Sequence, residues 1–154
     1  MQMNDLLAQG AVKHLGRVSS KKRLLTDLAH TAADAYSLDA EAGLAALQER
    51  ESLGPTGVGN GVALPHARLP GLDSVQGVFF RLDTPLEYDA ADRRPVDLIF
   101  ALFAPEDAGV AHLKALALVS RTLRNGALLA KLRANSDVQI LHTLLTDAEA
   151  SAAA

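Results

Sequence analysis

The sequence predicts a single-domain α/β fold in which a mixed β-sheet is sandwiched between helices. Two segments rich in β-forming residues, 75–82 and 96–103, lie between segments with helical periodicity. The stretch from 98 to 103 is apolar at every position, which is typical of a strand buried on both faces. The length of 154 residues fits one domain, and the sequence contains no internal repeat.

Two helices are predicted before these strands. Ser20 can cap the first helix and Asp39 the second. In the second helix Leu44 and Leu47 face the core, and Gly54 ends the helix. The apolar stripe of the first helix consists of Leu24, Leu25, Leu28, Ala32 and Ala35.

The remaining elements continue the alternation of strands and helices. The polar connection at 83–95 has room for another short strand near 86–88. We expect the domain to span residues 1–148 and to be followed by a disordered, alanine-rich tail at 149–154. The other predicted elements are a short strand at 62–65, a helix at 109–124 and two shorter helices at 127–133 and 136–145.

Charge and composition narrow the possible partners. The chain carries 15 Lys and Arg against 18 Asp and Glu, a formal net charge of −3. Nucleic-acid-binding proteins concentrate positive charge, so we expect no nucleic acid partner. The basic run at 21–23 opposes the dipole at the start of the first predicted helix. We expect it on a solvated face, with a docking patch for an acidic partner as the alternative.

The sequence gives no indication of a cofactor or of a membrane segment. The chain has no cysteine, which excludes disulfides and thiolate metal sites. Its five histidines are scattered and form no His-Glu-x-x-His motif, so we expect no metal and no cofactor. The N-terminus lacks the pattern of a signal peptide, and the apolar run at 98–105 is too short to cross a bilayer. The sequence therefore predicts a cytoplasmic protein without membrane insertion.

The most distinctive segment ends in Pro65 and His66. Proline fixes its own φ and confines the residue before it to extended conformations, so His66 follows a rigid stretch. A neutral imidazole held in this way is a good nucleophile near neutral pH, because the ordinary pKa of histidine lies just below 7. We therefore expect His66 to accept a phosphoryl group.

The segment before this histidine contains three candidates for binding phosphate through backbone N–H groups: Gly59, Asn60 and Gly61. The alternative is that they only form a turn. Established phosphate-binding motifs do not fit the segment. A P-loop needs Lys and then Ser or Thr after its last glycine, and the dinucleotide fingerprint needs a different glycine spacing and a following helix. A Gly-x-Ser-x-Gly motif for a nucleophilic serine is also absent from the sequence.

Residues 59–66 (Gly-Asn-Gly-Val-Ala-Leu-Pro-His) resemble the active-site segment of the enzyme IIA domains of the bacterial phosphoenolpyruvate phosphotransferase system. The resemblance is to the mannitol/fructose type (EIIA type 2), and within it to the nitrogen-regulatory branch. Sugar-transporting relatives often carry a glutamate where this chain has Asn60. The similarity covers most of the chain, with further matching blocks at 20–23, 49–54, 95–102 and 112–120.

The resemblance implies roles for three side chains. His66 would carry the phosphoryl group on Nε2, His112 would be the second active-site histidine, and Arg50 would be the active-site arginine. Without the resemblance, His112 is an ordinary residue at a helix start and Arg50 a cation near a helix C-terminus. The transfer step needs no metal or nucleotide, because the protein mainly positions the groups and stabilises charge on the phosphoryl oxygens.

The resemblance further implies a phosphocarrier and regulatory protein of the nitrogen-related phosphotransferase system. His66 would receive the phosphoryl group from phosphoenolpyruvate by way of enzyme I and an HPr-like phosphocarrier (NPr). As a phosphotransferase component with a phosphohistidine intermediate, the protein would regulate target proteins by phosphorylation-dependent binding. Two alternatives stay open. One is a sugar-specific enzyme IIA that passes phosphate to a IIB partner, and the other is an interaction module whose histidine is never phosphorylated.

Overall fold

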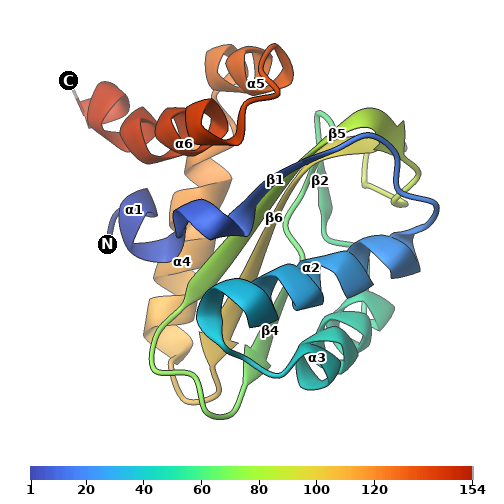
Figure 1. The fold of residues 1–154 in the computed structure, drawn as a ribbon, viewed down its shortest axis with the longest axis vertical. Helices are drawn as coiled ribbons and strands as arrows, with labels where there is room; N and C mark the ends of the chain where they lie inside the picture. The colour runs from blue at the N-terminus through green and yellow to red at the C-terminus, as the bar shows by residue number, and fades with distance from the viewer. Residues whose placement is uncertain (154) are drawn as a thin grey trace.

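A six-stranded mixed sheet forms the centre of the protein in the computed structural model (Figure 1). The structure describes the backbone of residues 1–153 and the side chains of residues 1–147. The strands are β1 (Val12–Leu15), β2 (Gly57–Gly59), β3 (Val62–Ala63), β4 (His66–Leu69), β5 (Gln76–Leu86) and β6 (Val96–Pro105). The helices are α1 (Met3–Leu6), a 3-10 turn η1 (Gln9–Ala11), α2 (Lys21–Tyr36), α3 (Ala40–Ser52), α4 (Gly109–Thr122), α5 (Gly126–Arg133) and α6 (Val138–Ala153).

Strand β6 organises the sheet. It pairs with β5 in antiparallel fashion on one side and, in parallel, with β3 and then β4 on the other. The strand order is β1-β5-β6-β3-β2, with β4 paired to β6 further along. Every residue of β6 except Asp97 is buried, which confirms the prediction of a strand covered on both faces.

Helices cover both faces of the sheet, as the sequence predicts. Helices α2 and α3 pack together on one face, and α4 and α6 lie on the other (Figure 1). Both predicted caps are confirmed. The Ser20 hydroxyl accepts a hydrogen bond from the N–H of Arg23, and the Asp39 carboxylate accepts from the N–H groups of Glu41 and Ala42.

Three sequence predictions need correction. Residues 86–88 do not form a separate strand, because β5 continues to Leu86, which pairs with Val96 of β6. In the basic run at 21–23, Lys22 and Arg23 are exposed as predicted, whereas Lys21 is partly buried and its ammonium lies 2.8 Å from a Glu51 carboxylate oxygen. Helix α6 starts at residue 138 rather than 136 and extends to 153 rather than 145. Side chains beyond 147 and the whole of residue 154 lie outside the described residues, so the tail at 149–154 stays a prediction.

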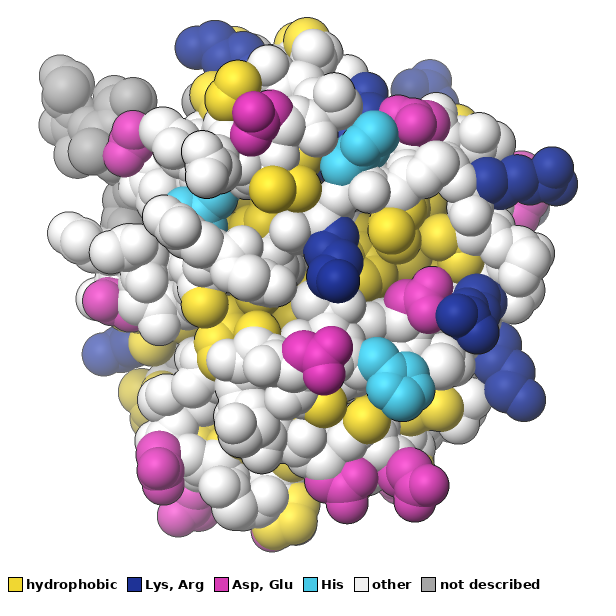
Figure 2. Space-filling view, viewed as in Figure 1, with side chains coloured by type: hydrophobic (Ala, Val, Ile, Leu, Met, Phe, Trp, Pro, Cys, Tyr) yellow, Lys and Arg dark blue, Asp and Glu magenta, His cyan; other side chains and the backbone are white. Residues whose placement is uncertain are grey.

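The molecular surface carries mixed charge. Acidic and basic side chains are interspersed over the face in Figure 2. No helix among the described residues is long and apolar enough to cross a membrane.

Candidate functional site

His66 is the first residue of β4, where the chain rejoins β6 after the interruption at Leu64 and Pro65. Its Nδ1 lies 2.8 Å from the carbonyl oxygen of Leu64. A carbonyl can only accept, so Nδ1 carries the ring proton and the lone pair of the neutral ring is on Nε2. The rigid segment that the sequence indicated therefore fixes the tautomer of His66 as well as its position.

His112 lies in the first turn of α4, and its ring stands at the edge of the His66 ring. The two ring centroids are 5.5 Å apart and the ring planes are inclined by 72°. The Nδ1 of His112 accepts a hydrogen bond of 3.3 Å from the Nε–H of Arg68. An arginine can only donate, so the proton of a neutral His112 is on Nε2. This Nε2 is buried and has no hydrogen-bond partner among the described residues, so its N–H is an unpaired donor beside His66.

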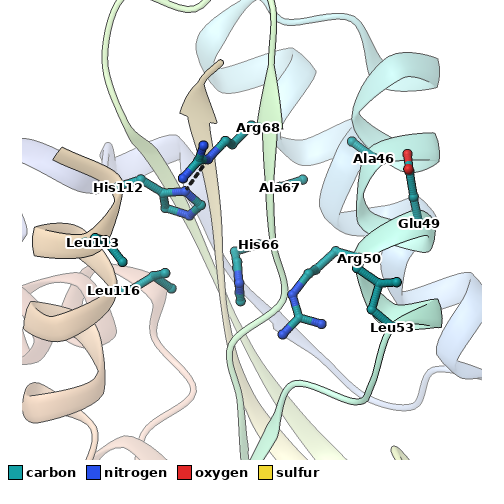
Figure 3. A pocket seen from close by; sticks show the side chains of 10 residues that line it. All are labelled: Ala46, Glu49, Arg50, Leu53, His66, Ala67, Arg68, His112, Leu113 and Leu116. Atoms are coloured by element: carbon teal, nitrogen blue, oxygen red, sulfur yellow. Dashed lines mark hydrogen bonds between the residues drawn. The ribbon is translucent and has the colours of Figure 1, made fainter. Parts of the chain in front are cut away.

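Arg50 approaches His66 from the opposite side, at the end of α3 (Figure 3). Its Nη1 donates a hydrogen bond of 3.0 Å to the carbonyl oxygen of Gly54, just beyond the helix. This bond bends the side chain along the end of its own helix. The guanidinium thereby reaches toward the imidazole of His66.

These side chains meet in a pocket of about 510 Å³ at the edge of the sheet. Strand β4 forms its floor, and α3 and α4 form its two walls (Figure 3). The walls combine cationic and apolar groups, and Leu53 and Leu113 on its rim are 81% and 65% exposed. The lining residues are Ala46, Glu49, Arg50, Leu53, His66, Ala67, Arg68, His112, Leu113 and Leu116.

Both histidines are neutral at pH 7. Burial lowers the pKa of His66 below 6.5, Arg50 lowers it further, and the Leu64 carbonyl and Glu51 act in the opposite direction. Burial, followed by the charges of His66 and Arg68, lowers the pKa of His112 to about 4. The pocket thus offers one free imidazole lone pair, one imidazole N–H donor and two guanidinium groups.

The three backbone candidates for phosphate binding lie outside this pocket. Gly59 is the last residue of β2, Asn60 and Gly61 form the turn to β3, and none of the three lines this pocket. The N–H of Asn60 donates to the carboxylate of Asp92, and the carbonyl of Asn60 accepts from Arg133. All three residues have positive φ, so the turn accounts for the glycines.

Arg68 is the site residue that sequence reasoning missed. Residues two apart on a strand point to the same side, so a strand starting at His66 places the side chain of Arg68 beside it. The strand predicted at 62–65 stops before His66, whereas in the structure β3 ends at Ala63 and a new strand, β4, starts at His66. A side chain added at Gly109, the first residue of α4, would lie 4.0 Å from Nη2 of Arg68. The guanidinium is therefore close to the positive end of the α4 dipole.

Comparison with known proteins assigns the chain to a family. Residues 5–147 match the family model described as "Phosphoenolpyruvate-dependent sugar phosphotransferase system, EIIA 2". The chain belongs to this EIIA type 2 family. The resemblance seen in the sequence is confirmed, and the EIIA domain is a component of the phosphotransferase system.

The described residues contain no group of histidine and carboxylate side chains that could hold a metal ion.

The relatives of this EIIA domain point to the nitrogen-regulatory branch. It is 44% identical over 153 residues to a nitrogen regulatory protein of Bradyrhizobium diazoefficiens, covering 99% of this chain and 100% of that protein. It is 37% identical to the nitrogen regulatory protein of Escherichia coli over 97% of this chain and 92% of that protein. The crystal structure of the nitrogen regulatory protein IIA-Ntr from Neisseria meningitidis superposes with a TM-score of 0.87. That structure is 33% identical, over 94% of this chain and 99% of the other.

Proposed function

We propose that this EIIA domain is a phosphocarrier of the nitrogen-related phosphotransferase system that accepts a phosphoryl group on Nε2 of His66. The observation that carries the proposal is the bond from Nδ1–H of His66 to the Leu64 carbonyl, which leaves the Nε2 lone pair free beside donors. An HPr-like phosphocarrier is the proposed donor. The names of the relatives support the nitrogen-regulatory branch.

The geometry supports the following transfer step. The Nε2 lone pair of His66 attacks phosphorus, and the bond between phosphorus and the donor atom breaks with its electron pair staying on the donor. The proton stays on Nδ1, where it donates to the Leu64 carbonyl, so the phosphorylated ring carries one positive charge that offsets part of the negative charge of the phosphoryl group. The N–H of His112 and the guanidinium of Arg50 are placed to stabilise charge on the phosphoryl oxygens.

The surroundings of the pocket support a regulatory role. Three large apolar side chains are mostly exposed here: Leu53 and Leu113 on the rim of the pocket, and Val110 on the same helix as Leu113. Exposed apolar side chains around a functional group are typical of a surface that binds other proteins. A phosphoryl group on His66 would add a charge of about −1.5 to −2 at its centre. Target proteins would then bind one phosphorylation state in preference to the other.

The decisive experiment measures the intact mass of the protein after incubation with phosphoenolpyruvate, enzyme I and the HPr-like carrier. We expect one acid-labile phosphoryl group on the wild type and none on His66→Ala. The exposed histidine variant His30→Ala is the matched control and should be labelled like the wild type. Full labelling of His66→Ala would overturn the assignment of the site. An unlabelled wild type, with active upstream components, would instead favour an interaction module.

A further inference from the structure

The core-facing stripe of α3 ends in a charged residue. Gly43 and Leu47 are the buried residues of this helix, and Glu51 follows Leu47 at the same spacing of four. The side chain of Glu51 is only 6% exposed. A carboxylate therefore occupies the helix position where an apolar side chain would be expected.

Four donors surround this carboxylate. The ammonium of Lys21 lies 2.8 Å from Oε2, which also accepts a bond of 3.3 Å from the N–H of Thr56. The hydroxyl of Tyr88 donates to Oε1 over 2.9 Å, and the Thr56 hydroxyl donates to the same oxygen. The ammonium of Lys21 also lies 4.2 Å from the centre of the Tyr88 ring. We call these four residues (Lys21, Glu51, Thr56 and Tyr88) the Glu51 cluster.

The end of α3 has little other attachment to the core. Leu47 is the last buried apolar residue of the helix, whereas Ser52 and Leu53 are exposed. The N–H of Leu53 bonds to the carbonyl of Arg50, and the N–H of Gly54 bonds to that of Glu51. These bonds are internal to the last turn. The Glu51 cluster instead joins that turn to α2, to Thr56 before β2 and to the connection after β5.

This turn carries Arg50. The guanidinium of Arg50 bonds to the carbonyl of Gly54, and both residues belong to the turn that Glu51 anchors. A shift of the turn would move this guanidinium relative to His66. Replacing a buried ion pair by apolar residues often leaves the stability of a protein unchanged or increases it. A contribution to stability is therefore a weak explanation for a carboxylate at this position. Fixing the direction of a neighbouring functional side chain gives a better one.

We propose that Glu51 is a positioning residue for phosphoryl transfer, whose buried carboxylate, held by four donors, fixes the end of α3 so that Arg50 faces His66. The inference rests on the proposed function of His66 and adds a residue that never touches the phosphoryl group. Glu51 acts through Arg50. Removal of the Glu51 carboxylate should therefore slow phosphoryl acceptance only when Arg50 is present.

A double-mutant cycle tests this dependence. We expect Glu51→Gln to slow phosphoryl acceptance by about tenfold in the wild-type background, the lower end of losses seen for residues that orient functional groups. In an Arg50→Ala background, Glu51→Gln should cause no further loss. Equal loss in both backgrounds would overturn the proposal. Tyr88→Phe removes a single donor from the same carboxylate and should show the same dependence on Arg50 if Glu51→Gln folds poorly.

A control and an independent readout complete the test. Asp97→Asn breaks another partly buried pair, that of Asp97 with Arg133, outside the pocket. This variant should leave the rate of phosphoryl acceptance unchanged.

The order parameter of the Arg50 Nε–H bond, from ¹⁵N relaxation, should fall in Glu51→Gln and stay at its wild-type value in Asp97→Asn. An unchanged order parameter in Glu51→Gln would contradict the inference. A wild type that accepts no phosphoryl group would contradict the proposed function, and the order parameter would then decide this inference alone.

Discussion

His66 and His112 carry their ring protons on opposite nitrogens. The Leu64 carbonyl holds the proton of His66 on Nδ1, and the donor Nε–H of Arg68 places that of His112 on Nε2. The rings lie edge to face with their centroids 5.5 Å apart. One ring therefore presents a lone pair and its neighbour a hydrogen-bond donor, which is the arrangement that a nucleophile and a charge-stabilising group require.

The first prediction concerns the donor. Substitution His112→Ala removes the free Nε2–H and should slow phosphoryl acceptance by about 100-fold, as loss of one preorganised donor does in other sites. His112→Gln keeps an amide N–H and should recover part of the rate. The measurement is the rate of phosphohistidine formation under excess donor. Wild-type rates in His112→Ala would show that this N–H plays no part in transfer.

The second prediction concerns Arg68. Substitution Arg68→Ala removes the donor to Nδ1 of His112, so the ring is free to exchange its proton between the two nitrogens. Long-range ¹H–¹⁵N NMR spectra at pH 7 should show His112 protonated on Nε2 in the wild type and a mixture of tautomers in the variant. The tautomer of His66 should not change, because its partner is the Leu64 carbonyl. Arg23→Ala, at an exposed arginine of α2, is the control and should leave both rings unaffected.

The sequence predicted those parts of the fold that carry strong local signals. Ser20 and Asp39 mark helix starts by their side chains, and the apolar run within β6 marks a strand buried on both faces. Strands β1, β2 and β4 were missed because each is short, without the run of β-forming residues seen in β5 and β6, and is stabilised by pairing with a neighbouring strand.

The same distinction applies to the site. His66 is recognisable from its own neighbourhood, because the proline before it restricts the backbone. Arg50 and His112 were predicted as site residues only through the family resemblance. They meet at His66 because α3 and α4 pack on either side of β4, and that packing depends on contacts between residues distant in sequence.

The third prediction concerns the effect of pH on stability. In the unfolded chain both histidines have a pKa near 6.5, whereas in the fold His66 titrates lower and His112 at about 4. The unfolded state therefore takes up protons first as the pH falls. The free energy of unfolding should decrease from about pH 6.5 toward pH 4, by at most about 1.4 kcal/mol per pH unit for each histidine.

Urea unfolding between pH 7.5 and pH 4.5 measures this slope. The carboxylates of Asp83 and Asp92 also lose stabilising interactions in acid, but their pKa values are lowered from 3.8, so their contribution falls largely below this window. His112→Gln should reduce the slope because it removes one of the two titrating rings. A slope equal to that of the wild type would show that His112 is not the source of the acid sensitivity.

The last prediction separates the glycine turn from the pocket. Gly61 has φ of +78°, and a Cβ there would contact Nη2 of Arg133 and lie 2.8 Å from the carboxylate of Asp97. Gly61→Ala must therefore strain the backbone and open the Asp97–Arg133 pair, at a cost of about 1–3 kcal/mol in the free energy of unfolding. Since Gly61 does not line the pocket of His66, phosphoryl acceptance by the folded variant should be unchanged. Gly126→Ala is the control, because a Cβ at this first position of α5 meets open space and should not destabilise the protein. A Gly61→Ala protein with wild-type stability but no phosphoryl acceptance would return the turn to a direct role in phosphate binding.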